Sequence, residues 1–290
     1  MREFDYERPD SLDSALELLG NLRDKARVIA GGTDLLPLLR EDMLVPTHVV
    51  DISRLAELNF IRNEEGLIKI GAATKMRSIE QSDIVRRKIP MFADAAQLVG
   101  EIGVRNLATL GGNLANASPA GDSAPPLLVL DASATIRNRK TERTIRLADF
   151  FVHVKKTILQ PNELLTEIKI PIPPQHSGGA FLRLAKRGGN LISIVSAAAF
   201  MSLENGLIKT VRIAMGSVAP TPIRIPTAEN VLRGSEPTET KMREAAETIK
   251  ETIKPISDVR ASAEYRKETG VILVRRALEQ AYMQTKGTRT

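Results

Sequence analysis

The sequence predicts an α+β protein of two domains, and three observations support this fold class. The chain has 290 residues, which is longer than one typical domain and short for three. Helical and strand-like patterns alternate along it, and 42% hydrophobic residues are enough for a buried core. The stretch PIPPQHSGG at Pro171–Gly179 can form neither a helix nor a central strand. We therefore expect domains of residues 1–175 and 176–290.

The first domain opens with a helix that leads into a strand. A polar cap residue precedes apolar residues at helical spacing over Asp10–Leu19, and a short strand follows at Arg27–Ala30. Further strands are expected at Thr47–Ile52, Leu67–Gly71, near Thr135 and Thr144, and at Leu164–Ile170. Further helices are expected at Thr74–Ser82, Met91–Val99 and Ala124–Asp131.

The second domain is predicted to contain an antiparallel sheet covered by helices. Two apolar strands, Ser193–Leu203 and Leu207–Met215, flank Glu204, Asn205 and Gly206. An Asn-Gly pair can adopt the positive φ values of a tight hairpin turn. Helical patterns at Lys241–Thr252 and Thr269–Thr285 close the chain and would cover this sheet.

Composition excludes several functional classes. Aromatic residues make up 3% of the chain, and the formal charge of +6 is scattered rather than clustered, which argues against nucleic-acid binding. The absence of cysteine excludes disulfides, thiolate nucleophiles and iron–sulfur clusters held by this chain, and the three histidines are too far apart for a metal motif. No triad or carboxylate dyad is evident, so we assign no catalytic and no metal-binding residue. A charged amino terminus and no apolar run of membrane-spanning length predict a cytoplasmic protein.

Two glycine-rich segments are the candidates for a binding site. They read AGGTDLL at Ala30–Leu36 and TLGGNLAN at Thr109–Asn116, and each places a glycine pair beside hydroxyl or amide side chains. Consecutive glycines let backbone N–H groups approach a diphosphate closely. Either pair could also form an ordinary tight turn. Neither segment matches the glycine pattern of a Rossmann fold or a P-loop, so another nucleotide-binding fold is required.

Five longer segments resemble the FAD-binding subunits of molybdenum hydroxylases, the family of the xanthine dehydrogenase and carbon monoxide dehydrogenase medium subunits. The resemblance extends over essentially the whole chain, because these segments are spread along it. They are RVIAGGTDLL at Arg27–Leu36, ATLGGNLANASPAGDSAPPLLVLDA at Ala108–Ala132, ELLTEIKIP at Glu163–Pro171, GSVAPTPIRIPTAE at Gly216–Glu229 and DVRASAEYR at Asp258–Arg266. The resemblance implies a FAD-binding domain of the vanillyl-alcohol-oxidase (PCMH) type over residues 1–175. Its two subdomains, about 1–53 and 54–175, would clasp the cofactor, and the domain at 176–290 would close over the flavin ring.

The same resemblance implies which residues bind FAD. The diphosphate would be wrapped by backbone amides of the first segment, and the second segment would form another phosphate and ribityl loop. Single positions elsewhere would complete the site. The implied cofactor-binding residues are Val28, Ile29, Ala30, Gly31, Gly32, Thr33, Asp34, Thr109, Gly111, Gly112, Asn113, Asp122, Leu164, Phe181 and Leu191.

Three of these positions, and a neighbouring pair of cations, need further comment. Asp122 could accept hydrogen bonds from sugar hydroxyls or cap the helix that follows it. Phe181 could approach the cofactor or be an ordinary core residue, and Leu191 would shield the flavin without stacking on it. The adjacent Lys186 and Arg187 could stabilise an anionic reduced flavin or be exposed loop cations.

The resemblance also implies the activity and the partners. FAD would be bound noncovalently, because neither glycine segment contains the His or Cys that covalent attachment needs. Electrons would come from 2Fe–2S clusters on a small subunit, substrate hydroxylation would occur at the molybdenum cofactor of a large subunit, and NAD or another acceptor would be reduced. Two alternatives remain: a self-sufficient flavin oxidase with its own organic substrate, and a nonenzymatic anion-binding or assembly module.

Overall fold

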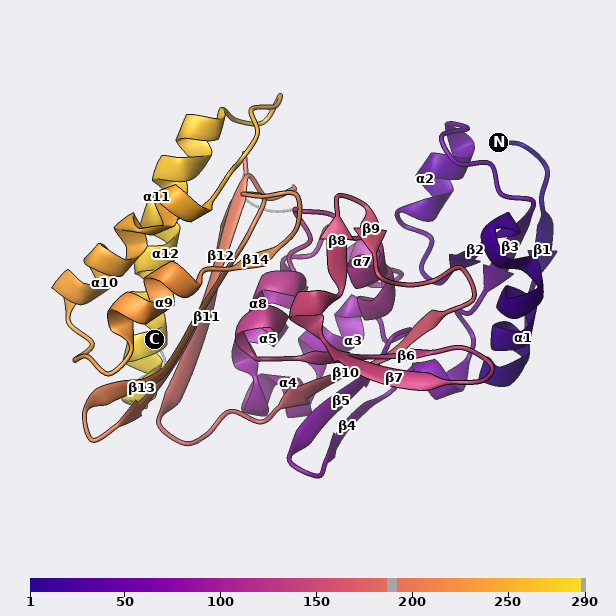
Figure 1. The fold of residues 1–290 in the computed structure, drawn as a ribbon. Helices are drawn as coiled ribbons and strands as arrows, with labels where there is room; N and C mark the ends of the chain where they lie inside the picture. The colour runs from indigo at the N-terminus through magenta and orange to yellow at the C-terminus, as the bar shows by residue number, and fades with distance from the viewer. Residues whose placement is uncertain (187–191, 288–290) are drawn as a thin grey trace.

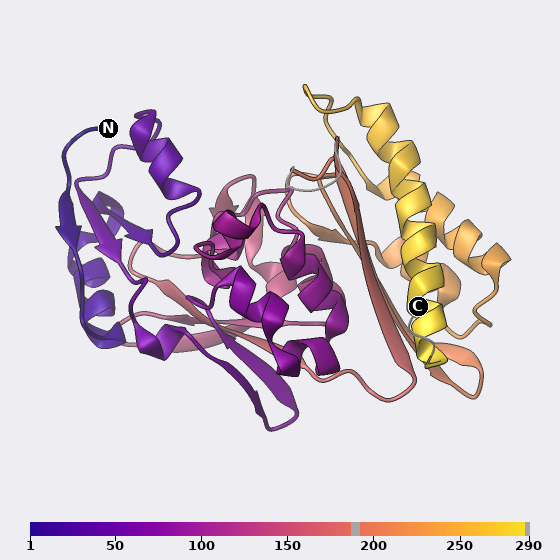
Figure 2. The same cartoon turned by 180° about the vertical axis from the view of Figure 1, so that it is seen from behind.

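The computed structural model describes residues 1–186 and 192–287. Figures 1 and 2 show three blocks of structure arranged side by side in chain order, with the amino-terminal block at one end and the carboxyl-terminal block at the other. Within the described residues, no helix combines the length and the apolar character needed to cross a membrane.

The amino-terminal block is a three-stranded parallel sheet covered by one helix. Its strands follow the order β1-β3-β2, and the buried face of α1 packs with β2 and β3 in one apolar cluster. Ser11 caps α1, because its hydroxyl accepts a hydrogen bond from the Ser14 amide at 3.2 Å. The elements are β1 (Asp5–Glu7), α1 (Leu12–Leu22), the 3-10 helix η1 (Arg23–Lys25), β2 (Ala26–Ile29), α2 (Leu35–Arg40) and β3 (His48–Asp51).

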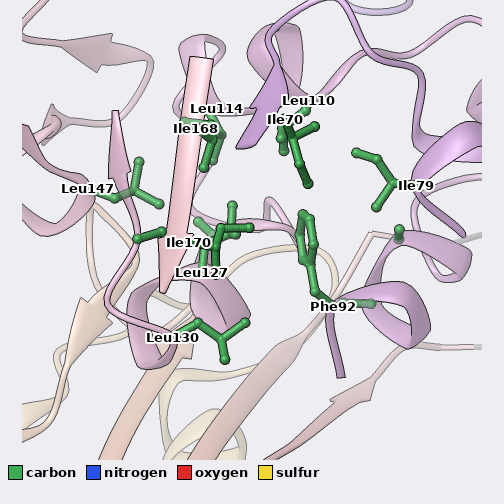
Figure 3. Close-up of a cluster of buried hydrophobic side chains, with 14 of the residues drawn as sticks. Ile70, Ile79, Phe92, Leu110, Leu114, Leu127, Leu130, Leu147, Ile168 and Ile170 are labelled. Atoms are coloured by element: carbon green, nitrogen blue, oxygen red, sulfur yellow. The ribbon is translucent and has the colours of Figure 1, made fainter. Parts of the chain in front are cut away.

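The central block is a five-stranded antiparallel sheet, of order β4-β5-β10-β6-β7, with short helices on one face. Figure 3 shows the core between sheet and helices, where isoleucines of β5 and β10 meet Phe92 and leucines of the helices. The elements are η2 (Ala56–Leu58), β4 (Ile61–Glu64), β5 (Leu67–Gly71), α3 (Met76–Gln81), α4 (Asp83–Lys88), α5 (Pro90–Gln97), α6 (Ile102–Arg105), α7 (Leu110–Ala115), α8 (Ala124–Val129), β6 (Ser133–Arg137), β7 (Glu142–Arg146), η3 (Leu147–Asp149), β8 (Phe151–His153), β9 (Lys156–Thr157) and β10 (Leu164–Pro171).

The carboxyl-terminal block is a four-stranded antiparallel sheet of order β11-β12-β13-β14. The long helix α12 packs on β11 and β12, and α8 of the central block contacts β12 and β13, so the sheet lies between helices of two blocks (Figures 1 and 2). The elements are β11 (Ser177–Leu184), β12 (Val195–Glu204), β13 (Leu207–Gly216), β14 (Ile223–Arg224), α9 (Pro226–Leu232), α10 (Glu239–Glu247), α11 (Ile249–Thr252) and α12 (Ala263–Thr285).

The α+β class and the antiparallel carboxyl-terminal sheet are confirmed. The hairpin turn has the expected conformation, with φ values of 52° at Asn205 and 81° at Gly206. Three details of the prediction are wrong. The helix expected over Lys241–Thr252 is interrupted at Thr248 between α10 and α11, and the last helix begins at Ala263, capped by Ser262, rather than at Thr269.

The third error concerns the segment Pro171–Gly179, which was expected to hold no central strand. Pro171 is the last residue of β10, a central strand, where it pairs with Leu67 of β5. A proline at a strand end removes only one ladder hydrogen bond, which explains why it is tolerated there. Ser177 already begins the edge strand β11, so the irregular link between the two sheets is shorter than predicted.

Candidate cofactor-binding site

The two glycine-rich segments lie against each other at Gly31. A Cβ atom on Gly31 would lie 2.1 Å from the carbonyl oxygen of Leu107, just before the second segment. Gly111 similarly packs on Ala72, donating its amide to the Ala72 carbonyl at 2.7 Å. Close approach of the chain to itself therefore requires both of these glycines.

The second glycine of each pair has a different role. Gly32 has a φ of 71°, a conformation that residues with a side chain rarely adopt. Gly112 donates its amide to the Thr109 hydroxyl at 3.1 Å, which makes Thr109 the cap of α7. The expectation of a loop here is wrong: Gly111, Gly112 and Asn113 lie in this short helix.

Polar side chains then link the two segments. Asn116 donates to the Asp34 carboxylate at 2.7 Å, and Lys155 donates to the Asn116 side-chain oxygen at 2.7 Å. The Asn113 side-chain oxygen accepts a hydrogen bond from Ser123 at 2.5 Å. These bonds fix the polar edge of both segments relative to the β8–β9 hairpin and the start of α8.

A cavity of about 760 Å³ extends from these segments to the carboxyl-terminal block. Five arginines and lysines line it against three aspartates, and small or apolar residues such as Val104, Ala120 and Ile192 supply much of the remaining wall. The charged lining residues are Asp34, Asp122, Lys155, Arg183, Lys254, Asp258, Arg260 and Arg266. This size, with an excess of positive charge, fits a large anionic ligand that carries both polar and apolar groups.

Asp122 joins the central block to the carboxyl-terminal block. One carboxylate oxygen accepts from Arg183 of β11 at 2.6 Å and the other from the Ser193 hydroxyl at 2.6 Å, and all three side chains are buried. Burial raises the pKa of Asp122 above its ordinary value, and the bonds from Ser193 and Arg183 offset this only in part. The alternative of a helix cap is wrong, because Ser123 occupies the N-cap position of α8 and both carboxylate oxygens of Asp122 accept from Arg183 and Ser193 instead.

The predicted residues divide into three groups. Thr33, Asp34, Asn113 and Asp122 line the cavity. Leu191 and Arg187 lie outside the described residues. The other predicted positions are not among the described residues that line the cavity. They are Val28, Ile29, Ala30, Gly31, Gly32, Thr109, Gly111, Gly112, Leu164 and Phe181. Of these, Leu164 is buried in the amino-terminal apolar cluster and Phe181 in the central one. Lys186, the other cation considered near the flavin, donates to the Val259 carbonyl at 2.8 Å.

Comparison with known proteins identifies the family. Residues 2–173 match the family model described as the FAD binding domain in molybdopterin dehydrogenase, and residues 180–281 match the CO dehydrogenase flavoprotein C-terminal domain. The chain belongs to the flavoprotein (medium) subunits of the molybdenum hydroxylases. It is therefore a FAD-binding oxidoreductase subunit, and the fold of the PCMH type is confirmed.

Individual relatives of this flavoprotein subunit match it over 80% to 98% of its length. The carbon monoxide dehydrogenase medium chain of Hydrogenophaga pseudoflava is 32% identical over 96% of this chain and 97% of its own. The caffeine dehydrogenase subunit beta of Pseudomonas sp. is 38% identical over 80% of this chain and 78% of its own. A solved structure of carbon monoxide dehydrogenase from Hydrogenophaga pseudoflava superposes with a TM-score of 0.95, covering 98% of both chains.

Sequence reasoning missed much of the cavity wall of this flavoprotein subunit. Lys155 lies between β8 and β9 and Arg183 lies on β11, in segments that carry no recognisable motif. Ser193 begins a predicted strand, which indicates no binding role. Two carboxyl-terminal segments of the resemblance also line the cavity, although their place there was not predicted: GSVAPTPIRIPTAE contributes Ser217, and DVRASAEYR contributes Asp258, Arg260 and Arg266.

Proposed function

We propose that this subunit holds one FAD noncovalently in the cavity between its three blocks. Residues 1–53 and 54–175 would form the FAD-binding domain, and residues 176–290 would close the cavity. The observation that carries this proposal is that one cavity is lined by the polar residues of both glycine-rich segments and by cations of the carboxyl-terminal block. In a chain that matches flavoprotein subunits over most of its length, this cavity has the size and charge that FAD requires.

The chain's own residues would bind and orient the cofactor. Thr33 and Asn113 supply polar groups at the segment edges, and cations such as Lys155 can neutralise phosphate oxygens. Asp122, which precedes α8 and pairs with Arg183 of β11, would hold the carboxyl-terminal wall of the cavity against the cofactor. The predicted direct contacts from Val28 to Asp34, and from Thr109 to Asn113, remain part of this proposal.

The proposed role is electron transfer within a cytoplasmic complex. Bound FAD accepts electrons singly or in pairs, which suits it to join one-electron and two-electron carriers. We infer that electrons come from 2Fe–2S clusters of a small subunit, and that NAD or another acceptor receives them. The hydroxylation itself would take place at the molybdenum cofactor of a large subunit, so this chain needs no acid, base or nucleophile of its own.

The isolated chain, loaded with FAD, is expected to oxidise no purine, aldehyde or N-heterocycle, because the substrate site lies on another subunit. Turnover is measured under steady-state conditions with an artificial dye as electron acceptor. The matched control is the complex purified with its large and small subunits, which should turn over one of these substrate classes. Direct turnover by the isolated chain would contradict the relay and favour the self-sufficient oxidase.

A further inference from the structure

A buried arginine in the first turn of α12 joins three separate parts of the cavity wall. Arg266 donates to the carbonyl of Ile194 at 2.5 Å and to that of Ser217 at 3.3 Å, and its other terminal nitrogen donates to Asp258 at 2.7 Å. Ile194 directly precedes β12, and Ser217 directly follows β13. One side chain thus ties the ends of two neighbouring strands to the turn before α12.

Arg266 is almost inaccessible to solvent, with 3% of its surface exposed, although it contributes to the wall of the cavity. Its Nε has no hydrogen-bond partner among the described residues. A buried guanidinium is costly unless its charge is paired, and here Asp258 supplies the pairing carboxylate. Lysine could not replace this arrangement, because only the planar guanidinium presents several donors in fixed directions.

Asp258 in turn shapes the segment that follows it. Its carboxylate accepts from the backbone amides of Arg260 and Ala261, at 2.8 and 3.2 Å, and from the Arg260 side chain at 3.1 Å. Burial acts to raise the pKa of Asp258, but the bonds from Arg260, Arg266 and Ala261 outweigh it and lower the pKa to about 2. The carboxylate is therefore ionised at neutral pH and holds Arg260 at the cavity.

The same hydrogen bonds continue to the central block. The Ser217 hydroxyl donates to the Ser193 carbonyl at 2.9 Å, and the Ser193 hydroxyl donates to Asp122. The Ser217 amide donates to the Pro119 carbonyl at 2.7 Å, in the loop that precedes α8. Ser217 has a φ of 61°, so this residue is held in a strained conformation by its surroundings. Pro119, Asp122, Ser193 and Ser217 all line the cavity.

We propose that Arg266, with Asp258, is a positioning residue of the FAD site that fixes the carboxyl-terminal wall of the cavity. The inference rests on the proposed function. It assigns the segment DVRASAEYR to cofactor retention: Arg266 sets the spacing of Ser193, Ser217 and Arg260, and these groups face the ligand. Loss of Arg266 would free the wall to move while the sheet and α12 keep their apolar core.

The test compares two ion-paired arginines of the same block in the full-length chain, the buried Arg266 and the partly buried Arg224. Arg266→Met removes the donors but keeps an apolar chain of similar length. Arg224→Met is the matched control, because Arg224 also pairs with a buried acid, Glu229, at 2.7 Å and reaches the Leu128 carbonyl across the block contact, yet it does not line the cavity. Both variants should lower the thermal midpoint of the cofactor-free chain.

Only Arg266→Met is expected to weaken FAD binding, by about tenfold or more in Kd, because three bonds to a charged group are lost from the wall. Arg224→Met should stay within about twofold of the unmodified chain. Arg266→Lys should fall between them, since it keeps the charge but reaches fewer carbonyls. FAD titration, followed by flavin fluorescence at a temperature where circular dichroism shows each variant folded, provides the Kd.

An unchanged Kd in folded Arg266→Met, with a lowered thermal midpoint, would overturn the proposal and leave Arg266 a purely structural residue. If Arg266→Met does not fold, Asp258→Asn decides: it keeps an acceptor for the turn amides but removes the counter-charge, and it should raise the Kd by about threefold or more. An unchanged Kd there would likewise refute the role. Failure of the unmodified chain to bind FAD would instead refute the proposed function.

Discussion

Replacing Gly31 with alanine is expected to abolish FAD retention. The new Cβ would lie 2.1 Å from the Leu107 carbonyl oxygen and 2.6 Å from its carbon, and both are backbone atoms that no rotamer change can move. The two glycine-rich segments would have to separate, at a cost of about 1–3 kcal/mol in the free energy of unfolding. Chemical denaturation and FAD titration of the same preparation measure both effects.

The control for this change is Gly20→Ala in α1. Apart from the chain neighbours and the adjacent helix backbone, no atom of the described residues lies within 4 Å of the Cβ position at Gly20, so alanine should be accommodated there. Because alanine favours helix over glycine, this variant should gain about 0.5–1 kcal/mol in stability and bind FAD normally. Normal FAD affinity in Gly31→Ala would show that the contact between the segments does not shape the site.

Replacing Asp122 with alanine is expected to destabilise the chain by about 3–5 kcal/mol, because it leaves the Arg183 guanidinium buried without its counter-charge. Arg183 is 8% exposed and Asp122 6% exposed in this pair, so solvent cannot compensate. The measurement is the free energy of unfolding from denaturant titration. FAD binding should fall as well, because both side chains line the cavity.

A second substitution separates these two effects. The double variant Asp122→Ala, Arg183→Met also removes the buried charge of Arg183. Part of the lost stability should therefore return, while FAD binding stays weak. If the double variant is no more stable than Asp122→Ala, the ion pair is not the source of the destabilisation. If it binds FAD as tightly as the unmodified chain, the pair has no role at the cofactor.

Local patterns in the sequence predicted most of the regular structure. The strand at Leu67–Gly71 was predicted with the bounds it has, and the Asn205–Gly206 turn fixed the pairing of β12 with β13. Both signals depend on residues that are neighbours in sequence. Short strands such as β1, β4 and β14 have two to four residues and carry too little pattern to be recognised.

The site was harder to predict because its contacts join distant parts of the chain. Nothing near Gly31 in sequence indicates that it must admit the Leu107 carbonyl. Asp122 stands before a helix and so resembles a cap, but its partners are Arg183 and Ser193, more than sixty residues away. Arg266 lies at a helix start that the apolar periodicity does not reveal, since its side chain is buried among polar groups rather than apolar ones.

The visible absorption spectrum of the purified chain tests the central claim most directly. The chain is incubated with FAD, separated from free cofactor by gel filtration and then precipitated with acid. We expect a flavin spectrum on the folded protein and release of the colour into the supernatant, which would establish noncovalent FAD binding. A colourless chain that circular dichroism shows to be folded would contradict the assignment of the cavity to FAD, and colour that stays with the precipitate would contradict noncovalent attachment.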